Sequence, residues 1–220
     1  MKMNNLTLER HVHKHTTINL KEADGPCQVV ETDITYLPTR KGMTYLISFK
    51  DVFTKKWLGY NYSRSMTAND VIESMDDVAV REYDGKIPDS LIVRTDNGSQ
   101  YISRKFNDVL NIYKIGHEYI ERETPKENGD IESFHNSIKT DYIWINEIED
   151  YEEGKKLIEN AFYDYNNVRP HSTIDYYPPN KFIEKYNNDP EYREYYKQYL
   201  HKLKENYRKR NNYKKVVINV

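Results

Sequence analysis

Three acidic residues stand at positions of predicted strands and helices where an apolar residue would be expected, and together they could bind divalent metal ions. Asp33 interrupts a run of β-branched residues, although Asp has a poor preference for strands. Asp96 follows the apolar run 91–93, at the carboxyl end of a predicted buried strand, where open α/β sheets bind ligands. Glu132 lies at the boundary of the apolar face of a predicted helix. All three carboxylates could converge.

Converging carboxylates indicate phosphoryl transfer. They repel one another unless a cation neutralises them, and an all-oxygen site suits Mg²⁺ or Mn²⁺. Two such ions about 3.5–4 Å apart activate the attacking oxygen and stabilise the leaving oxygen of a phosphodiester. Residue types alone leave another interpretation open, because the chain has 35 Asp and Glu residues and most acids are solvated surface charges. The segment Asp96-Asn97-Gly98 is also a good turn by itself.

The elements that must position these acids are predicted to form a mixed sheet with flanking helices. Runs rich in β-branched residues predict an antiparallel meander of three strands, over 28–37, 44–53 and 57–63. A helix follows, because Thr67 and Asp70 give an N-terminal capping signal and apolar residues recur at helical spacing up to Tyr83. Apolar patterns then predict alternating strands and helices: a strand over 91–93, a helix over 106–113, a strand over 117–120 and a helix over 131–145. This order favours an α/β fold.

The remaining sequence predicts a helix over 151–165, which Arg169-Pro170 ends, and a domain end at Pro178-Pro179. A Tyr- and Lys-rich helical stretch over 191–210 follows. We therefore expect three regions: an N-terminal lead-in over 1–26, a catalytic core over 27–183 and a helical basic extension over 184–220.

Charge and composition narrow the class of protein. The 33 Lys and Arg residues nearly balance the 35 acids, for a net charge of −2, so overall charge gives no sign of a nucleic-acid partner. A single cysteine, Cys27, excludes a disulfide framework and a Cys-rich zinc module. A mean hydropathy of −0.95 without a long apolar run predicts no membrane association and a cytoplasmic protein, nucleoid-associated if the source is prokaryotic.

The basic charge gathers at the C-terminal end. From Lys197 to Val220 there are eight Lys and Arg residues against Glu205 alone, with tyrosines between them. Such a segment suits phosphate contacts supported by aromatic rings, and it equally suits a solvated helix face.

Three blocks around the acids resemble the catalytic motifs of DDE-class insertion-sequence transposases, which are close relatives of the retroviral integrase core. The blocks are 32–36 (TDITY), 95–101 (TDNGSQY) and 128–135 (NGDIESFH), and 35 residues separate Asp96 from Glu132, as in that family. The segments 165–172 (YNNVRPHS) and 178–179 resemble its closing signature. The resemblance covers about residues 28–183 and implies a ribonuclease-H-like fold: a mixed sheet flanked by helices.

This resemblance implies roles for individual residues. Asp33, Asp96 and Glu132 would be catalytic and would bind two Mg²⁺ ions, with Mn²⁺ as a substitute. Lys139, seven residues after Glu132, matches the family's DNA-contacting basic residue. The other residues expected to bind DNA are Asn128, Asn136, Arg169 and His171. The chain would nick DNA and transfer strands, with double-stranded transposon ends and target DNA as partners, in a homodimer or a larger synaptic assembly.

Two alternatives remain open from the sequence. The same acids on the same fold would serve a metal-dependent nuclease that performs only the hydrolytic step. A truncated or domesticated DNA-binding relic could retain the core without turnover. Joined DNA strands, nicked strands or neither would distinguish the three.

Overall fold

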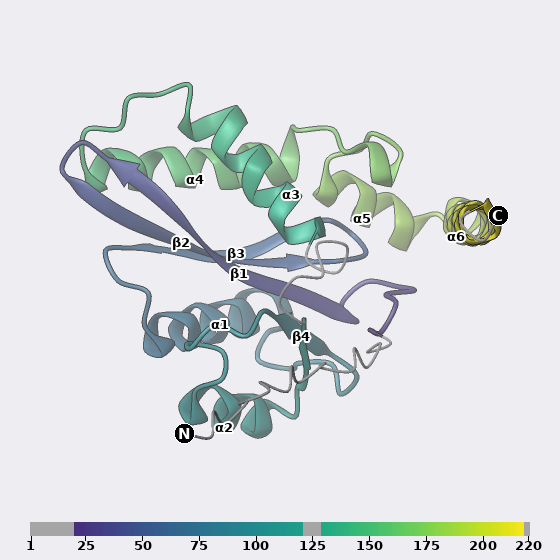
Figure 1. Ribbon diagram of the computed structural model, residues 1–220, viewed down its shortest axis with the longest axis horizontal. Coiled ribbons are helices and arrows are strands. Elements are labelled where there is room, and N and C mark those ends of the chain that lie inside the picture. The colour runs from purple at the N-terminus through teal and green to yellow at the C-terminus, as the bar shows by residue number, and fades with distance from the viewer. Residues whose placement is uncertain (1–19, 121–128, 218–220) are drawn as a thin grey trace, which may run out of the picture.

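The computed structural model describes residues 20–120 and 129–217, and a five-stranded mixed sheet lies at its centre (Figure 1). The strand order is β3-β2-β1-β4-β5. The strands are β1 (Val29–Thr39), β2 (Gly42–Asp51), β3 (Trp57–Ser63), β4 (Ile92–Thr95) and β5 (Gly116–Tyr119). The first three pair antiparallel, as their short connections require, and β4 and β5 add on in parallel. This sheet confirms the predicted α/β fold.

Helices cover both faces of the sheet, as Figure 1 shows. The helices α1 (Ala68–Tyr83) and α2 (Arg104–Tyr113) cover one face. The opposite face carries α3 (Gly129–Ile138), which continues as a π-helical turn (Lys139–Ile143), and α4 (Tyr151–Asn167). Thr67 caps α1 through a reciprocal capping box with Asp70, which confirms the predicted start of that helix.

Alternation along the strands divides the apolar residues between two cores. Val30 and Phe49 point to the α1–α2 face, where they join a core with Val71 and Phe106. On the α3–α4 face, Trp57 and its aromatic neighbours form the centre of the second core, which includes Leu37, Leu46, Ile131, Phe134, Ile158 and Tyr165. Side chains on one strand therefore reach different helices according to the parity of their position.

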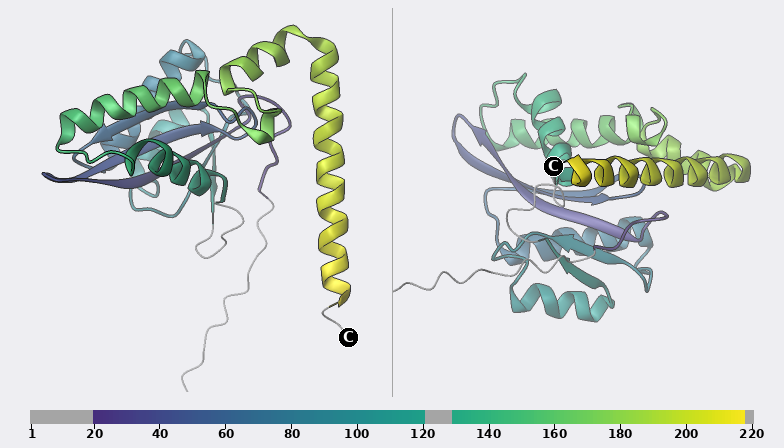
Figure 2. Two further views of the ribbon diagram at one scale, coloured as in Figure 1. Left: turned by 90° about the horizontal axis from the view of Figure 1, so that it is seen from above. Right: turned by 45° about the vertical axis from the view of Figure 1, so that its right-hand side comes forward.

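The C-terminal helices were only partly expected. The paired prolines at 178 and 179 end the preceding loop, but Pro179 also begins α5 (Pro179–Asn188), because proline is favoured in the first turn of a helix. Phe182 of this helix packs with Phe53 and with Tyr196 of α6 (Pro190–Val217) in a third apolar cluster. Beyond this cluster α6 projects away from the sheet as a long helix (Figure 2). Among the helices of residues 20–120 and 129–217, none has the length and apolarity needed to span a membrane.

Candidate active site at the edge between two parallel strands

Asp33 lies on β1, and Asp96 directly follows β4, the parallel neighbour of β1. The parallel register of β1 and β4 runs to the pair Glu31 and Arg94, so continuing it by two residues sets Asp33 beside Asp96. Tyr101 is 1% exposed close by, and burial raises its pKa, with further contributions from both carboxylates. Both carboxylates therefore lie close enough to Tyr101 to raise the pKa of its hydroxyl group.

The turn after β4 fixes the carboxylate of Asp96. The backbone amide of Gly98 donates a hydrogen bond to Asp96 Oδ1 over 2.8 Å. A Cβ at Gly98 would lie 2.9 Å from that same oxygen, so the close approach requires glycine. The segment Asp96-Asn97-Gly98 thus turns the chain, as its residues indicate, and its backbone orients the Asp96 carboxylate.

Helix α3 places His135 against the carboxylate of Asp33. His135 is 4% exposed, and its Nδ1 lies 3.4 Å from Asp33 Oδ2. The other ring nitrogen, Nε2, is buried without a hydrogen-bond partner in the structure. Glu132 precedes His135 by three residues, so it lies on the same side of α3, one turn nearer its N-terminus, with an exposed side chain.

The donor set fits a hard divalent cation. Asp33 and Asp96 offer carboxylate oxygens at one edge of the sheet, and such oxygens are the ligands that Mg²⁺ and Mn²⁺ prefer. Within residues 20–120 and 129–217, no three carboxylate, histidine or cysteine side chains are gathered closely enough to hold a metal ion. The structure thus assembles the first two acids, with Glu132 on the adjacent helix.

A buried ion cluster anchors the helix that carries Glu132. Lys50 on β2 is 1% exposed, and its ammonium group donates to the backbone oxygen of Asp130 over 2.9 Å and pairs with the Asp130 carboxylate at 3.0 Å. Lys55 pairs with the same carboxylate at 2.8 Å. Burial would raise the pKa of Asp130, but the two lysines lower it instead. The first turn of α3 is therefore held by charge as well as by packing.

The same cluster reaches β4 through a buried arginine. Glu31 lies 3.8 Å from Lys50 and accepts a hydrogen bond from Arg94 over 3.2 Å. Arg94 also pairs with Glu118 on β5 at 3.0 Å and donates to the backbone oxygen of Lys21 over 2.7 Å. Charged pairs thus connect four strands, β1, β2, β4 and β5, with α3, and Glu31 and Arg94 lie two residues before Asp33 and Asp96.

Two of the residues expected to bind DNA lie on the outer side of the α3 region. A depression of about 420 Å³ is lined by Glu132 and Asn136, together with Ser133, Ser137, Gly129, Thr140 and Asp141. Lys139 begins the π-helical turn that follows α3 and is half-buried. Asn128, the third expected residue in this region, lies outside the described residues.

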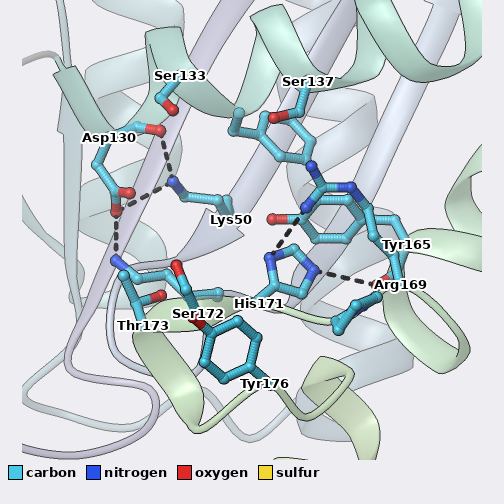
Figure 3. A pocket seen from close by; sticks show the side chains of 13 residues that line it. Lys50, Asp130, Ser133, Ser137, Tyr165, Arg169, His171, Ser172, Thr173 and Tyr176 are labelled. Atoms are coloured by element: carbon cyan, nitrogen blue, oxygen red, sulfur yellow. Dashed lines mark hydrogen bonds and ion pairs between the residues drawn. The ribbon is translucent and has the colours of Figure 1, made fainter.

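The other two line a cavity that adjoins this depression along α3, which Figure 3 shows from close by. Arg169 pairs with Asp141 at 2.9 Å, and its ring-facing guanidinium lies 5.8 Å from the centroid of Tyr165. His171 is 8% exposed and lies between Arg169 and the backbone oxygen of Tyr165, each at 3.4 Å. The cavity measures about 370 Å³.

His171 should make stability depend on pH. Burial and the neighbouring Arg169 lower the pKa of His171 from 6.5 to about 4, so the unfolded chain takes up its proton first as the pH falls. We expect the free energy of unfolding to fall by about 1–3 kcal/mol between pH 6.5 and 4 through this residue. Urea unfolding of the parent and of His171→Gln at pH 7 and pH 4.5 measures the difference.

The control for this prediction is His201→Gln. His201 lies on α6 with 74% of its side chain exposed. Its replacement should leave the pH dependence as in the parent, whereas His171→Gln should flatten part of it. An equal slope in the parent and in His171→Gln would show that the imidazole of His171 is not held neutral by the fold.

Several residues of the site were missed in the sequence. Lys50 carried a signal, because a lysine inside the otherwise apolar strand segment 44–53 must be either exposed or paired. Asp130 and Tyr176 carried none, since both lie in polar segments where such residues are ordinary. Their partners come from distant parts of the chain and are visible only in the fold.

Comparison with protein families agrees with this architecture. Two family models, each described as an integrase core domain, match residues 23–125 and 113–179. The transposase for insertion sequence element IS904 of Lactococcus lactis is 33% identical over 171 residues, which are 76% of this chain and 65% of the relative. Transposase InsF for insertion sequence IS3A of Escherichia coli is 30% identical over 74% of this chain and 56% of its own length. The chain thus spans about three-fifths of these relatives.

Solved structures show the same fold at low sequence identity. A chain of the simian T-cell lymphotropic virus intasome, solved in complex with a PP2A regulatory subunit, superposes with a TM-score of 0.61 and 18% identity. That match covers 74% of this chain and 56% of the other. The HTLV-2 integrase catalytic core domain, solved in complex with magnesium, gives 0.55 and 17% identity over 71% of this chain and 96% of its own. With its ribonuclease-H-like sheet and its matching motifs, the chain belongs to the integrase core family, to which the DDE insertion-sequence transposases also belong.

Proposed function

We propose that the chain is the catalytic core of a polynucleotidyl transferase that nicks DNA and joins the freed strand to target DNA. The observation that supports this proposal is the parallel pairing of β1, which carries Asp33, with β4, which Asp96 directly follows. The transposase relatives from Lactococcus lactis and Escherichia coli support the same reaction class. The substrates would be double-stranded transposon ends and a target duplex.

Asp33, Asp96 and Glu132 would hold two Mg²⁺ ions, with Mn²⁺ able to substitute. When bound, the ions supply activation of the attacking oxygen and stabilisation of the leaving oxygen. The chain's own residues do the positioning: Gly98 holds Asp96 by a backbone hydrogen bond, and Lys50 holds the first turn of α3 through Asp130. His135, against Asp33, restrains that carboxylate from the helix side.

Basic and amide side chains around this edge would bind the DNA backbone. Asn136 lines the same depression as Glu132, and Lys139 follows one turn later. Arg169 would contact a phosphate from the adjoining cavity, whereas the buried His171 would act by holding Arg169. The basic helix α6 would add phosphate contacts outside the core.

Two DNA ends must be processed together, so we propose action as a homodimer or a larger synaptic assembly, in the cytoplasm on nucleoid DNA. The neighbouring HTLV-2 integrase core is described in both trimeric and dimeric forms, which supports an oligomeric arrangement.

Replacement of Gly98 by Ala should reduce strand transfer by about 10- to 100-fold. The new Cβ would lie 2.9 Å from Asp96 Oδ1, so the carboxylate must move away from its position beside Asp33. Ser99→Ala, at the exposed next position, should retain parental rates. Gel assays of both variants with thermal unfolding as a check on folding would measure this, and parental rates for Gly98→Ala would show that the turn does not set the carboxylate position.

The proposed function is tested with a branched DNA that imitates the product of strand transfer. The full chain is incubated with Mn²⁺ and this DNA, and the strands are resolved on a denaturing gel. Release of one strand together with religation of the target strand supports a transferase, because hydrolysis cannot join strands. Nicks without joined strands support the nuclease, and bound but unchanged DNA, with folding verified, supports the binding protein.

A further inference from the structure

The cavity behind α3 concentrates positive charge. Its lining includes Lys50, Lys55 and Arg169 against the single carboxylate of Asp130. Two further carboxylates, Glu31 beside Lys50 and Asp141 beside Arg169, balance the charge of these cations but do not line the cavity. The neutral imidazole of His171 lies in the same wall, and its pKa is lowered first by burial and then in part by these three cations. An anionic group in the cavity would therefore meet cationic side chains directly in its wall.

Hydrogen-bond donors remain on its walls. The two contacts of Arg169 use Nε, toward Asp141, and one terminal nitrogen, toward His171, while the other terminal nitrogen takes part in neither. The ammonium group of Lys55 has three protons, and its pair with Asp130 uses one direction. Hydroxyl groups line the same space, from Ser133, Ser137, Ser172 and Thr173. This set of donors is typical of a phosphate site.

An aromatic ring stands at the mouth of the cavity. Tyr176 lines it with 71% of its surface exposed, and Figure 3 shows its ring below Ser172. Asp175 and Tyr176 both have left-handed backbones, with φ of 55° and 58°, a conformation that costs free energy for non-glycine residues. The backbone amide of Tyr176 donates to the oxygen of His171 over 2.9 Å, so the loop holds this exposed ring in place.

The cavity adjoins the catalytic edge along α3. Ser133 and Ser137 line both this cavity and the depression that contains Glu132. A DNA strand that passes Glu132 would therefore reach the cavity within a short distance along the helix. At about 370 Å³ the cavity is within the range of about 300–1,000 Å³ found for small-ligand sites, so it would accept one nucleotide and exclude a duplex.

We propose that this cavity binds a single unpaired nucleotide of the DNA substrate, with its phosphate on Lys55 and Arg169 and its base on the ring of Tyr176. The inference rests on the proposed action on DNA and adds a subsite to it. A base reaches such a cavity only after it has left the duplex stack, and stacking on an aromatic side chain offsets part of the cost of unstacking. The subsite would select substrates that are frayed or single-stranded next to the cut.

The test measures binding without turnover. The full chain is titrated, with divalent ions chelated, into a blunt duplex and into the same duplex with a three-nucleotide overhang carrying 2-aminopurine. We expect the parent to bind the overhang at least about fivefold more tightly and to quench the 2-aminopurine emission. Tyr176→Ala should lose both effects, Tyr176→Phe should retain them, and Arg169→Gln should lose the preference for the overhang.

Tyr163→Ala is the matched control, because Tyr163 on α4 is 66% exposed and does not line the cavity. It should behave as the parent. Equal binding of both DNAs by the parent, or a preference and quenching that survive Tyr176→Ala, would overturn the proposal. The assay contains no metal and no joining step, so it is independent of the strand-transfer assay. Strand transfer without a preference for the overhang would contradict only the subsite, and the preference without strand transfer would contradict only the proposed reaction.

Discussion

Replacing Asp96 by Asn is expected to reduce metal-dependent strand transfer by at least about 10³-fold while leaving the fold intact. The amide removes a negative charge from the pair with Asp33, and the loss of several kcal/mol of metal binding and transition-state stabilisation corresponds to a factor of this size. The amide oxygen can still accept the hydrogen bond from Gly98, so the turn should persist. Rates on branched DNA with Mn²⁺, measured with thermal unfolding, test both parts.

Asp33→Asn should behave in the same way, and Asp108→Asn serves as the control. Asp108 lies on α2 with 61% of its side chain exposed, and its pair with Arg104 is a surface contact. We expect parental rates for this control. Parental rates for a folded Asp96→Asn would contradict the assignment of the acid to catalysis.

Replacing Lys50 by Met is expected to lower the free energy of unfolding by about 3–5 kcal/mol. The change removes the buried cation that lies 3.0 Å from Asp130 and 3.8 Å from Glu31, and so leaves the buried Glu31 with Arg94 as its remaining cation and Asp130 with Lys55. Glu31 is 2% exposed, and water cannot easily replace the lost ammonium group. Urea unfolding at pH 7 measures the loss.

A double variant separates charge from packing in this prediction. Lys50→Met with Glu31→Gln should recover part of the lost stability, because the second change removes one of the unpaired charges. Lys41→Met is the surface control: Lys41 pairs with Asp150 at 3.0 Å but is 61% exposed, so its loss should change the free energy of unfolding much less than Lys50→Met does. Equal small losses for Lys50→Met and Lys41→Met would show that the buried cluster does not hold α3.

Local patterns predicted most of the fold. The β-branched runs around Asp33 and Trp57 form strands, and Thr67 with Asp70 begins α1, because these signals depend on a few neighbouring residues. The convergence of the acids stays a prediction, and the parallel pairing of β4 with the strand of Asp33 is visible only in the fold. Helical periodicity singled out Glu132 as the third acid, and the motif resemblance gave it a catalytic role.

The remaining features depend on contacts between distant segments. Lys50, Asp130 and Arg94 meet only when β2, α3 and β4 are packed together, and no periodicity in the sequence records such a meeting. The cavity beside Arg169 and Tyr176 likewise requires α3 and the loop before α5 to lie against each other. The left-handed backbone at Tyr176 is unexpected from its residue type, because tertiary contacts impose it.

Binding of divalent ions by the pair Asp33 and Asp96 is the most direct test of this account. Free Mn²⁺ is measured by electron paramagnetic resonance while the full chain is titrated, and the parent is compared with Asp96→Asn and Asp108→Asn. The account predicts saturable Mn²⁺ binding by the parent and by Asp108→Asn, and at least about a tenfold weaker affinity for Asp96→Asn. Equal Mn²⁺ affinity in the parent and in a folded Asp96→Asn variant would contradict it.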